Sequence, residues 1–156
     1  MKAITSLLLI AITVSAQSRD YPKTPPDKPV HASGAQQASD VDRAIQPYLA
    51  KARNTYPAVK KRFLAGLPPK YLLSLTTKLW DRSHTKFEVV FVVADEIKGG
   101  TVTGHLATHT KQPVGYDFGD RISFPESQVM DWTIVHPDGT EEGNVVGKFM
   151  DTYKPR

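Results

Sequence analysis

The fold is decided by residues 87–107, which read FEVVFVVADEIKGGTVTGHLA. Residues 87–94 are apolar on both faces except at Glu88, a pattern typical of a strand in the middle of a sheet. The Lys-Gly-Gly sequence at 98–100 predicts a tight hairpin turn, and residues 101–107 alternate with the two-residue period of a second strand. We therefore expect two antiparallel neighbours at the centre of a sheet.

A further strand and a helical segment precede this hairpin. Residues 71–79 alternate between apolar and polar side chains and predict a strand. Upstream, apolar residues recur at helical spacing from Ser39 or Asp40, either of which can cap a helix. Pro47 removes a backbone hydrogen bond inside that pattern, so we expect one kinked helix or two short helices, ending at Gly66.

Three more strands are expected after the hairpin. Residues 120–124 and 131–136 alternate in the same way, the Pro-Asp-Gly sequence at 137–139 predicts a turn, and residues 145–151 predict a last strand. Helices followed by hairpin-linked strands indicate an α+β domain, in which an N-terminal helical layer packs on an antiparallel sheet of about five or six strands. The sheet is either open or curled into a half-barrel.

Composition places the chain among single-domain globular proteins and excludes several kinds of site. It has 156 residues, with 20 Lys and Arg against 16 Asp and Glu, and its net charge of +4 is too small to indicate nucleic-acid binding. The absence of cysteine excludes disulfides, thiol nucleophiles, cysteine-bound metals and a lipid on cysteine. The sequence contains no Gly-rich phosphate loop, GxSxG or HExxH pattern, so no cofactor is expected.

The N-terminal region predicts export. Residues 1–16 combine Lys2, an apolar run too short to span a bilayer and small residues up to Ala16, which are the three parts of a secretory signal peptide. Residues 17–38 are rich in proline and polar side chains and predict a linker, so the folded domain is expected at 39–156. We expect cleavage after Ala16 and a periplasmic or secreted product without a transmembrane segment.

Short motifs recur in order through residues 44–150. They are Ala52, Arg53 and Pro57; residues 87–92 with Glu88; residues 101–104 with Leu106; residues 119–122 with Phe124; Asp131 and Trp132; and Gly143 and Gly147. In this order and spacing they resemble the DUF2314 (YegJ-like) family of exported bacterial proteins of unknown function. The resemblance implies the same α+β fold, and it implies no catalytic residues because none is established for the family. The chain departs from the family pattern at Phe91, at Thr108 and His109, and at Lys148.

Glu88 and Asp131 are the carboxyl groups most suggestive of a site. Glu88 stands among apolar residues, where burial would raise its pKa or a cation such as Arg121 would pair with it; a structural ion pair or an exposed sheet position is the alternative. Asp131 followed by Trp132 would suit a ligand platform, whereas a turn cap beside a core aromatic is the alternative. Together the two acids would suit a small hydrolase.

His105, His109 and His136 form a metal site only if the chain brings them together. Residues four apart on one strand lie ~13 Å from each other, so His105 and His109 would need a sharp turn between them and His136 as a third ligand. We favour exposed strand and loop histidines and predict no metal.

Residues 43–62 carry six basic residues and no acidic one. Lys60, Lys61 and Arg62 near a helix C-terminus complement its dipole, and the alternative is contact with an anionic envelope surface or an acidic protein. We therefore expect an exported, non-catalytic binding module for a protein or envelope component, acting through the sheet face or this basic helical layer. A hydrolase and a purely structural module stay open, as does the oligomeric state, while nucleic acid is not an expected partner.

Overall fold

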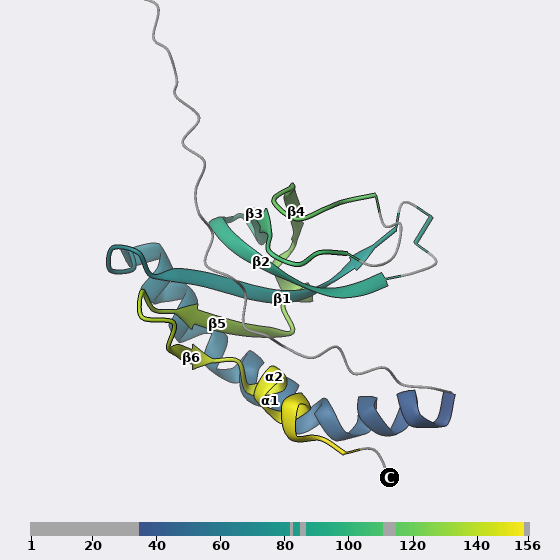
Figure 1. Ribbon diagram of the computed structural model, residues 1–156. Coiled ribbons are helices and arrows are strands. Elements are labelled where there is room, and N and C mark those ends of the chain that lie inside the picture. Colours follow the sequence, from purple (N-terminus) through teal and green to yellow (C-terminus); the bar gives the residue numbers. More distant parts are fainter. Residues whose placement is uncertain (1–34, 82, 85–86, 111–114, 155–156) are drawn as a thin grey trace, which may run out of the picture.

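One long helix lies along an antiparallel sheet, and a short C-terminal helix packs beside it (Figure 1). The computed structural model describes residues 35–81, 83–84, 87–110 and 115–154. The predicted signal peptide and residues 17–34 of the predicted linker lie outside the described residues. Helix α1 spans Ala35–Ala65 and helix α2 spans Val145–Thr152. None of the described helices is both long enough and apolar enough to cross a membrane.

The sheet is open and has six strands. They are β1 (Leu72–Trp80), β2 (Phe87–Lys98), β3 (Thr101–Leu106), β4 (Arg121–Pro125), β5 (Asp131–Val135) and β6 (Glu141–Gly143). Their order across the sheet is β4-β3-β2-β1-β5-β6, every neighbouring pair is antiparallel, and a 3₁₀ turn at Glu126–Gln128 joins β4 to β5. The α+β class and the antiparallel sheet on an N-terminal helical layer are therefore confirmed. The sequence did not predict β6.

The hairpin that decides the fold occupies the middle of the sheet. Strand β2 lies between β1 and β3, as its apolar pattern predicts. Gly99 and Gly100 have φ angles of +58° and +77°, which are the left-handed values of a two-residue hairpin turn, and they connect Lys98 to its partner Thr101. The central strand and the hairpin are confirmed.

Helix α1 is one helix of 31 residues, so the alternative of two short helices is wrong. It begins at Ala35, so residues 35–38 of the predicted linker are helical, and it runs through both Pro47 and Pro57. Each proline loses one backbone hydrogen bond. An apolar stripe that packs on the sheet offsets this loss, because each buried side chain contributes roughly 1.5–3 kcal/mol. The stripe consists of Leu49, Ala52, Tyr56 and Val59.

One face of the sheet and one face of α1 form the core. Residues directly opposite each other in antiparallel strands point to the same side, and the register places Leu75 opposite both Val92 and Trp132. The indole N–H of Trp132 donates to the Thr55 hydroxyl of α1 at 2.9 Å, which ties the helix to β5. The buried apolar residues of this core include Ala52, Tyr56, Val59, Leu73, Leu75, Val90, Val92, Leu106, Ile122, Trp132 and Ile134.

Residues 145–152 form α2, so the strand predicted at 145–151 is wrong. The β-branched pair Val145 and Val146 favours a strand locally, but the backbone N–H of Val146 donates to the Asp131 carboxylate at 2.6 Å. A carboxylate that accepts from the first turn stabilises a helix N-terminus. At the other end of α2, the Phe149 ring stacks on Tyr48 of α1 with 4.2 Å between the ring centroids. Contacts distant in sequence therefore decide this element.

Candidate functional site

Glu88 and Arg121 are not brought together. Glu88 is half-buried in β2 and lies opposite Leu79 of β1. Arg121 is exposed in β4 opposite His105, which in turn lies opposite Val93 of β2. Positions 88 and 93 of β2 are separated by ~16 Å along the strand. The predicted ion pair between Glu88 and Arg121 is therefore not formed.

Glu88 and Asp131 point to opposite faces of the sheet. Their partners on β1 are Leu79 and Thr76, and positions three apart on one strand face opposite sides. The carboxyl pair that a hydrolase would need is therefore not assembled.

Asp131 and Trp132 serve the fold, and they do not form the predicted ligand platform. Their exposed fractions are 1% and 9%, which leaves no surface for a ligand. The Asp131 carboxylate accepts from the backbone N–H groups of Trp132, at 2.8 Å, and of Val146. Burial raises the pKa of Asp131, and hydrogen bonds from the backbone of Val146, Trp132 and Gly147 oppose that rise. The cap beside a core aromatic is the arrangement observed.

The three candidate metal-binding histidines lie beside three different carboxylates. His105 Nδ1 lies 2.8 Å from Asp95, and His109 Nδ1 lies 3.7 Å from Asp117. His136 Nε2 lies 2.9 Å from Glu142. Within the described ranges, no group of three or more His, Cys, Asp or Glu side chains is placed to hold a metal ion.

The basic segment is partly neutralised by one acid from the 3₁₀ turn after β4 and one from β6. Lys60 Nζ lies 2.7 Å from Glu126, and the Arg62 guanidinium donates to both carboxylate oxygens of Glu142 at 2.6 and 2.9 Å. Lys61 is exposed. In the part of the chain that the structure describes, no ion pair is formed by three cations of the segment, namely Lys51, Arg53 and Lys61.

Replacing Glu142 with glutamine is expected to remove an acid-sensitive part of the stability. Hydrogen bonds from Arg62 and His136 lower the pKa of Glu142 from 4.5 to about 2. A carboxyl whose pKa is lower in the folded than in the unfolded protein stabilises the fold above the unfolded pKa, and this contribution is lost as the pH falls from about 4.5 towards 2. Urea denaturation should be measured from neutral to acid pH. The unfolding free energy should decrease less on acidification in Glu142→Gln than in the wild type.

The matched control is Glu96→Gln, which removes an exposed carboxyl from β2. This variant should follow the wild-type pH curve. Parallel curves for the wild type and Glu142→Gln would contradict the stabilising role of the Glu142 cluster.

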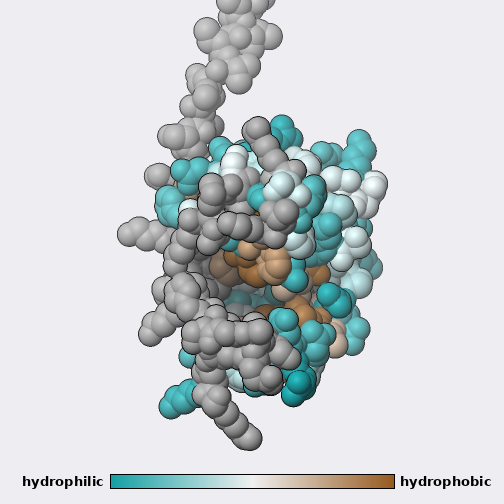
Figure 2. Space-filling model, turned by 90° about the vertical axis from the view of Figure 1, so that its right-hand side faces the viewer, coloured by the Kyte–Doolittle hydropathy of each residue, from teal (hydrophilic) through white to brown (hydrophobic). Residues whose placement is uncertain are grey.

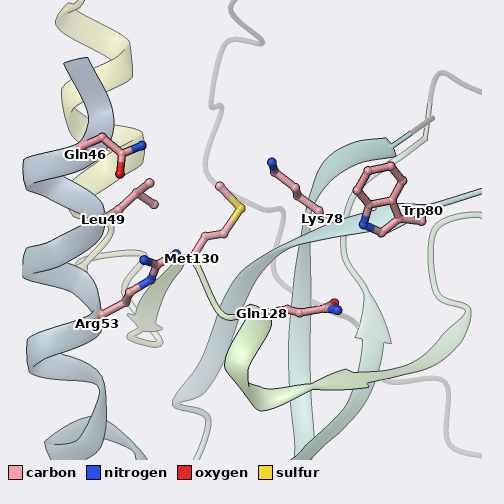
Figure 3. Close-up of a pocket in the computed structure, with 7 residues that line it drawn as sticks. All are labelled: Gln46, Leu49, Arg53, Lys78, Trp80, Gln128 and Met130. Atoms are coloured by element: carbon pink, nitrogen blue, oxygen red, sulfur yellow. The ribbon is translucent and has the colours of Figure 1, made fainter. Parts of the chain in front are cut away.

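A groove opens where α1 diverges from the end of β1. We call it the α1–β1 groove, and its volume is about 330 Å³ (Figure 3). Figure 2 faces the side on which the N-terminal end of α1 and the end of β1 lie, and it shows apolar residues in a hollow beside hydrophilic ones. The α1–β1 groove is lined by residues of α1 (Gln46, Leu49, Arg53), of β1 (Lys78, Trp80) and of the chain between β4 and β5 (Gln128, Met130).

Helix and strand geometry explain why these side chains converge. Positions 46, 49 and 53 are three and four residues apart, so they share one face of α1. Positions 78 and 80 are two apart, so they share one face of β1. The hydroxyl of Thr77 donates to the Gln128 carbonyl at 3.2 Å, and the Met130 N–H donates to the Thr76 carbonyl at 2.8 Å, which fixes the third wall against β1.

The groove combines positive charge with an apolar floor. Arg53 and Lys78 supply two cations, two glutamine amides supply donors and acceptors, and no carboxylate is among the lining residues that the structure describes. The apolar lining residues, which we call the floor, are Leu49, Met130 and Trp80. The Lys78 ammonium also lies 4.3 Å from the centre of the Phe87 ring. This lining can bind an anion beside an apolar group.

Sequence reasoning found this groove only in part. Arg53 belongs to the basic segment, and its spacing from Gln46 and Leu49 was a readable helical signal. The sequence did not indicate Lys78 and Trp80, because no local sequence pattern predicts that the end of β1 lies near α1. No family model, curated protein or solved structure matches the chain.

Proposed function

We propose that the protein is an exported, non-catalytic binding module and that its α1–β1 groove holds an anionic ligand with an apolar part. The observation that carries the proposal is the lining of the groove, whose described residues join two cations and two amides to an apolar floor and include no carboxylate. The helical layer and the sheet, which are the two surfaces that the sequence favours for binding, both contribute walls. Export rests on the signal-peptide pattern of residues 1–16.

Each part of the lining suits one part of such a ligand. Arg53 and Lys78 would donate charged hydrogen bonds to a carboxylate, sulfonate or phosphate, and such bonds are about twice as strong as neutral ones. The amides would orient neighbouring polar atoms, and the Trp80 ring would cover an apolar portion. A volume of about 330 Å³ lies at the small end of the range for ligand sites, which fits a head group or a single side chain better than a large cofactor.

Anilinonaphthalene sulfonate is a suitable first probe, because it joins an anion to aromatic rings. We expect its fluorescence to rise on titration with the folded protein. The double variant Arg53→Gln with Lys78→Gln should bind the probe roughly tenfold or more weakly, since each charged hydrogen bond is worth about 1.5–3 kcal/mol. Trp80→Ala should also weaken binding through lost apolar contact.

The control is the double variant Lys51→Gln with Lys61→Gln, which removes the same charge from exposed positions outside the groove. It should bind the probe like the wild type. Equal affinities for the two double variants would reject the groove as the binding site. If neither the probe nor dodecanoate binds the folded wild type, the purely structural alternative is supported instead.

A further inference from the structure

We infer that the ligand of the α1–β1 groove is an anionic lipid head group at a membrane surface, and that an exposed apolar shelf beside the groove inserts into the bilayer interface. The shelf consists of Phe87 and Val89 on β2 together with Trp80 on β1. This inference rests on the proposed function and assigns the source of the ligand.

The shelf is continuous with the groove. The register places Trp80 opposite Phe87 and Lys78 opposite Val89, so all four side chains project from the same face of the β1–β2 pair. The Trp80 and Phe87 ring centroids are 4.9 Å apart, and Trp80 lines the groove itself. An apolar surface therefore runs from the floor of the groove onto the outside of β2.

The shelf is open to solvent. Phe87 is 42% exposed and Val89 is 47% exposed, although the following residues of β2, Val90 and Val92, are fully buried. Nothing in the core requires apolar side chains at the two exposed positions. Contiguous exposed apolar residues mark surfaces that contact a membrane or another molecule.

Charge favours an anionic bilayer over a second protein surface of mixed charge. The Lys78 ammonium lies over the Phe87 ring, at the boundary between the shelf and the groove. At membrane surfaces, lysine typically packs its aliphatic chain along apolar groups while its ammonium reaches the polar head groups. Arg53, on the α1 wall, is the second cation of the groove lining. Glu88 lies between Phe87 and Val89 in sequence but projects from the opposite face of β2.

The distribution of ion pairs also supports a membrane contact through the groove and the shelf. The acids that neutralise the basic segment, Glu126 and Glu142, bind Lys60 and Arg62 near the C-terminal end of α1. No described acid forms an ion pair with Arg53 or Lys78 at the groove end. Positive charge therefore remains where the apolar shelf is exposed, and this combination fits anionic head groups above an acyl layer.

Vesicle flotation tests the inference on the full folded domain. The wild type should float with phosphatidylcholine vesicles that contain phosphatidylglycerol and should not float with phosphatidylcholine alone. The shelf variant, Phe87→Ser with Val89→Ser, should bind the anionic vesicles at least tenfold more weakly but bind anilinonaphthalene sulfonate as the wild type does. Leu64→Ser is the matched control, because Leu64 is an apolar residue of α1 that is 59% exposed and lies outside the groove.

The other outcomes separate this inference from the proposed function. If the probe binds in the groove but anionic vesicles do not bind, the lipid inference is overturned and the groove proposal stands. If neither binds, both fail. Flotation that is unchanged in the shelf variant, or equal on neutral vesicles, overturns the insertion of the shelf. A dimer in solution that the shelf variant abolishes, without vesicle binding, would assign the shelf to a second copy of the chain.

Discussion

Gly143→Ala should destabilise the domain by about 3–5 kcal/mol, because it combines backbone strain with a clash that no rotamer relieves. Gly143 has a φ of +82°, and a Cβ added there would lie 2.3 Å from the Trp132 carbonyl oxygen and 2.5 Å from the indole ring. Trp132 cannot move away. Its indole donates to Thr55, and its carbonyl oxygen accepts from the Asn144 N–H at 2.8 Å.

Gly139→Ala provides the control for this prediction. Gly139 has a φ of +84°, but an added Cβ would meet no atom within 4 Å. The free energy of unfolding of this variant should therefore fall only by the cost of the left-handed conformation, about 1–2 kcal/mol. Urea denaturation followed by circular dichroism measures both variants, and losses of equal size would show that the close approach to Trp132 does not matter.

Asp131→Ala should lower the free energy of unfolding by about 3 kcal/mol or more. The substitution leaves the N–H groups of Trp132 and Val146 without their acceptor, and each buried unsatisfied donor costs roughly 1–3 kcal/mol. Asp131→Asn should recover only part of this loss, because its NH₂ group would face one of these donors. The loss should also appear locally, as faster hydrogen exchange in α2 than in β2.

Asp151→Ala is the control for Asp131, because it removes an exposed carboxyl from α2 itself. It should change the unfolding free energy by about 0.5 kcal/mol or less. A similarly small loss in Asp131→Ala would contradict its role as the cap of α2. The pH dependence offers a second check, because the raised pKa of Asp131 makes its contribution largest below the unfolded value of 3.8 and smaller as the pH rises through the folded value. This sign is opposite to that of Glu142.

The sequence predicts the centre of the sheet well because its signals are local. Alternation in β1 and β3, apolar residues on both faces of β2 and the Gly-Gly turn each act within a few residues. The sequence leaves open whether α1 is one helix or two, and it fails at α2, because packing overrides local preference in both elements. Pro47 and Pro57 remain inside one helix, and α2 depends on Asp131, which lies fifteen residues before Val146.

The candidate site was less predictable than the fold. Asp131 and Trp132 have the chemistry of a ligand site, but their polar atoms are used to join β5 to the two helices. The groove residues form a site only because the end of β1 lies close to α1 in the folded protein, and the residue types alone do not predict this proximity. For this reason the sequence indicated Lys60 and Arg62, whose charges Glu126 and Glu142 neutralise, and did not indicate Lys78.

Several residues of the short motifs found in the sequence are required by close packing. Ala52 is fully buried, and a Cβ at Gly104 would lie 2.2 Å from the Val93 carbonyl oxygen. At Gly147, a Cβ would lie 2.1 Å from the Asn144 side chain. Positions of this kind specify close packing between elements.

The stack of Tyr48 on Phe149 has a consequence for the order of folding. It joins residues about a hundred positions apart, and the first helix rests on the last one. Contacts of such long range close large loops and form slowly, and they are absent while a chain is still being synthesised. We therefore expect the N-terminal half of α1, which carries one wall of the groove, to gain this support only after α2 has formed.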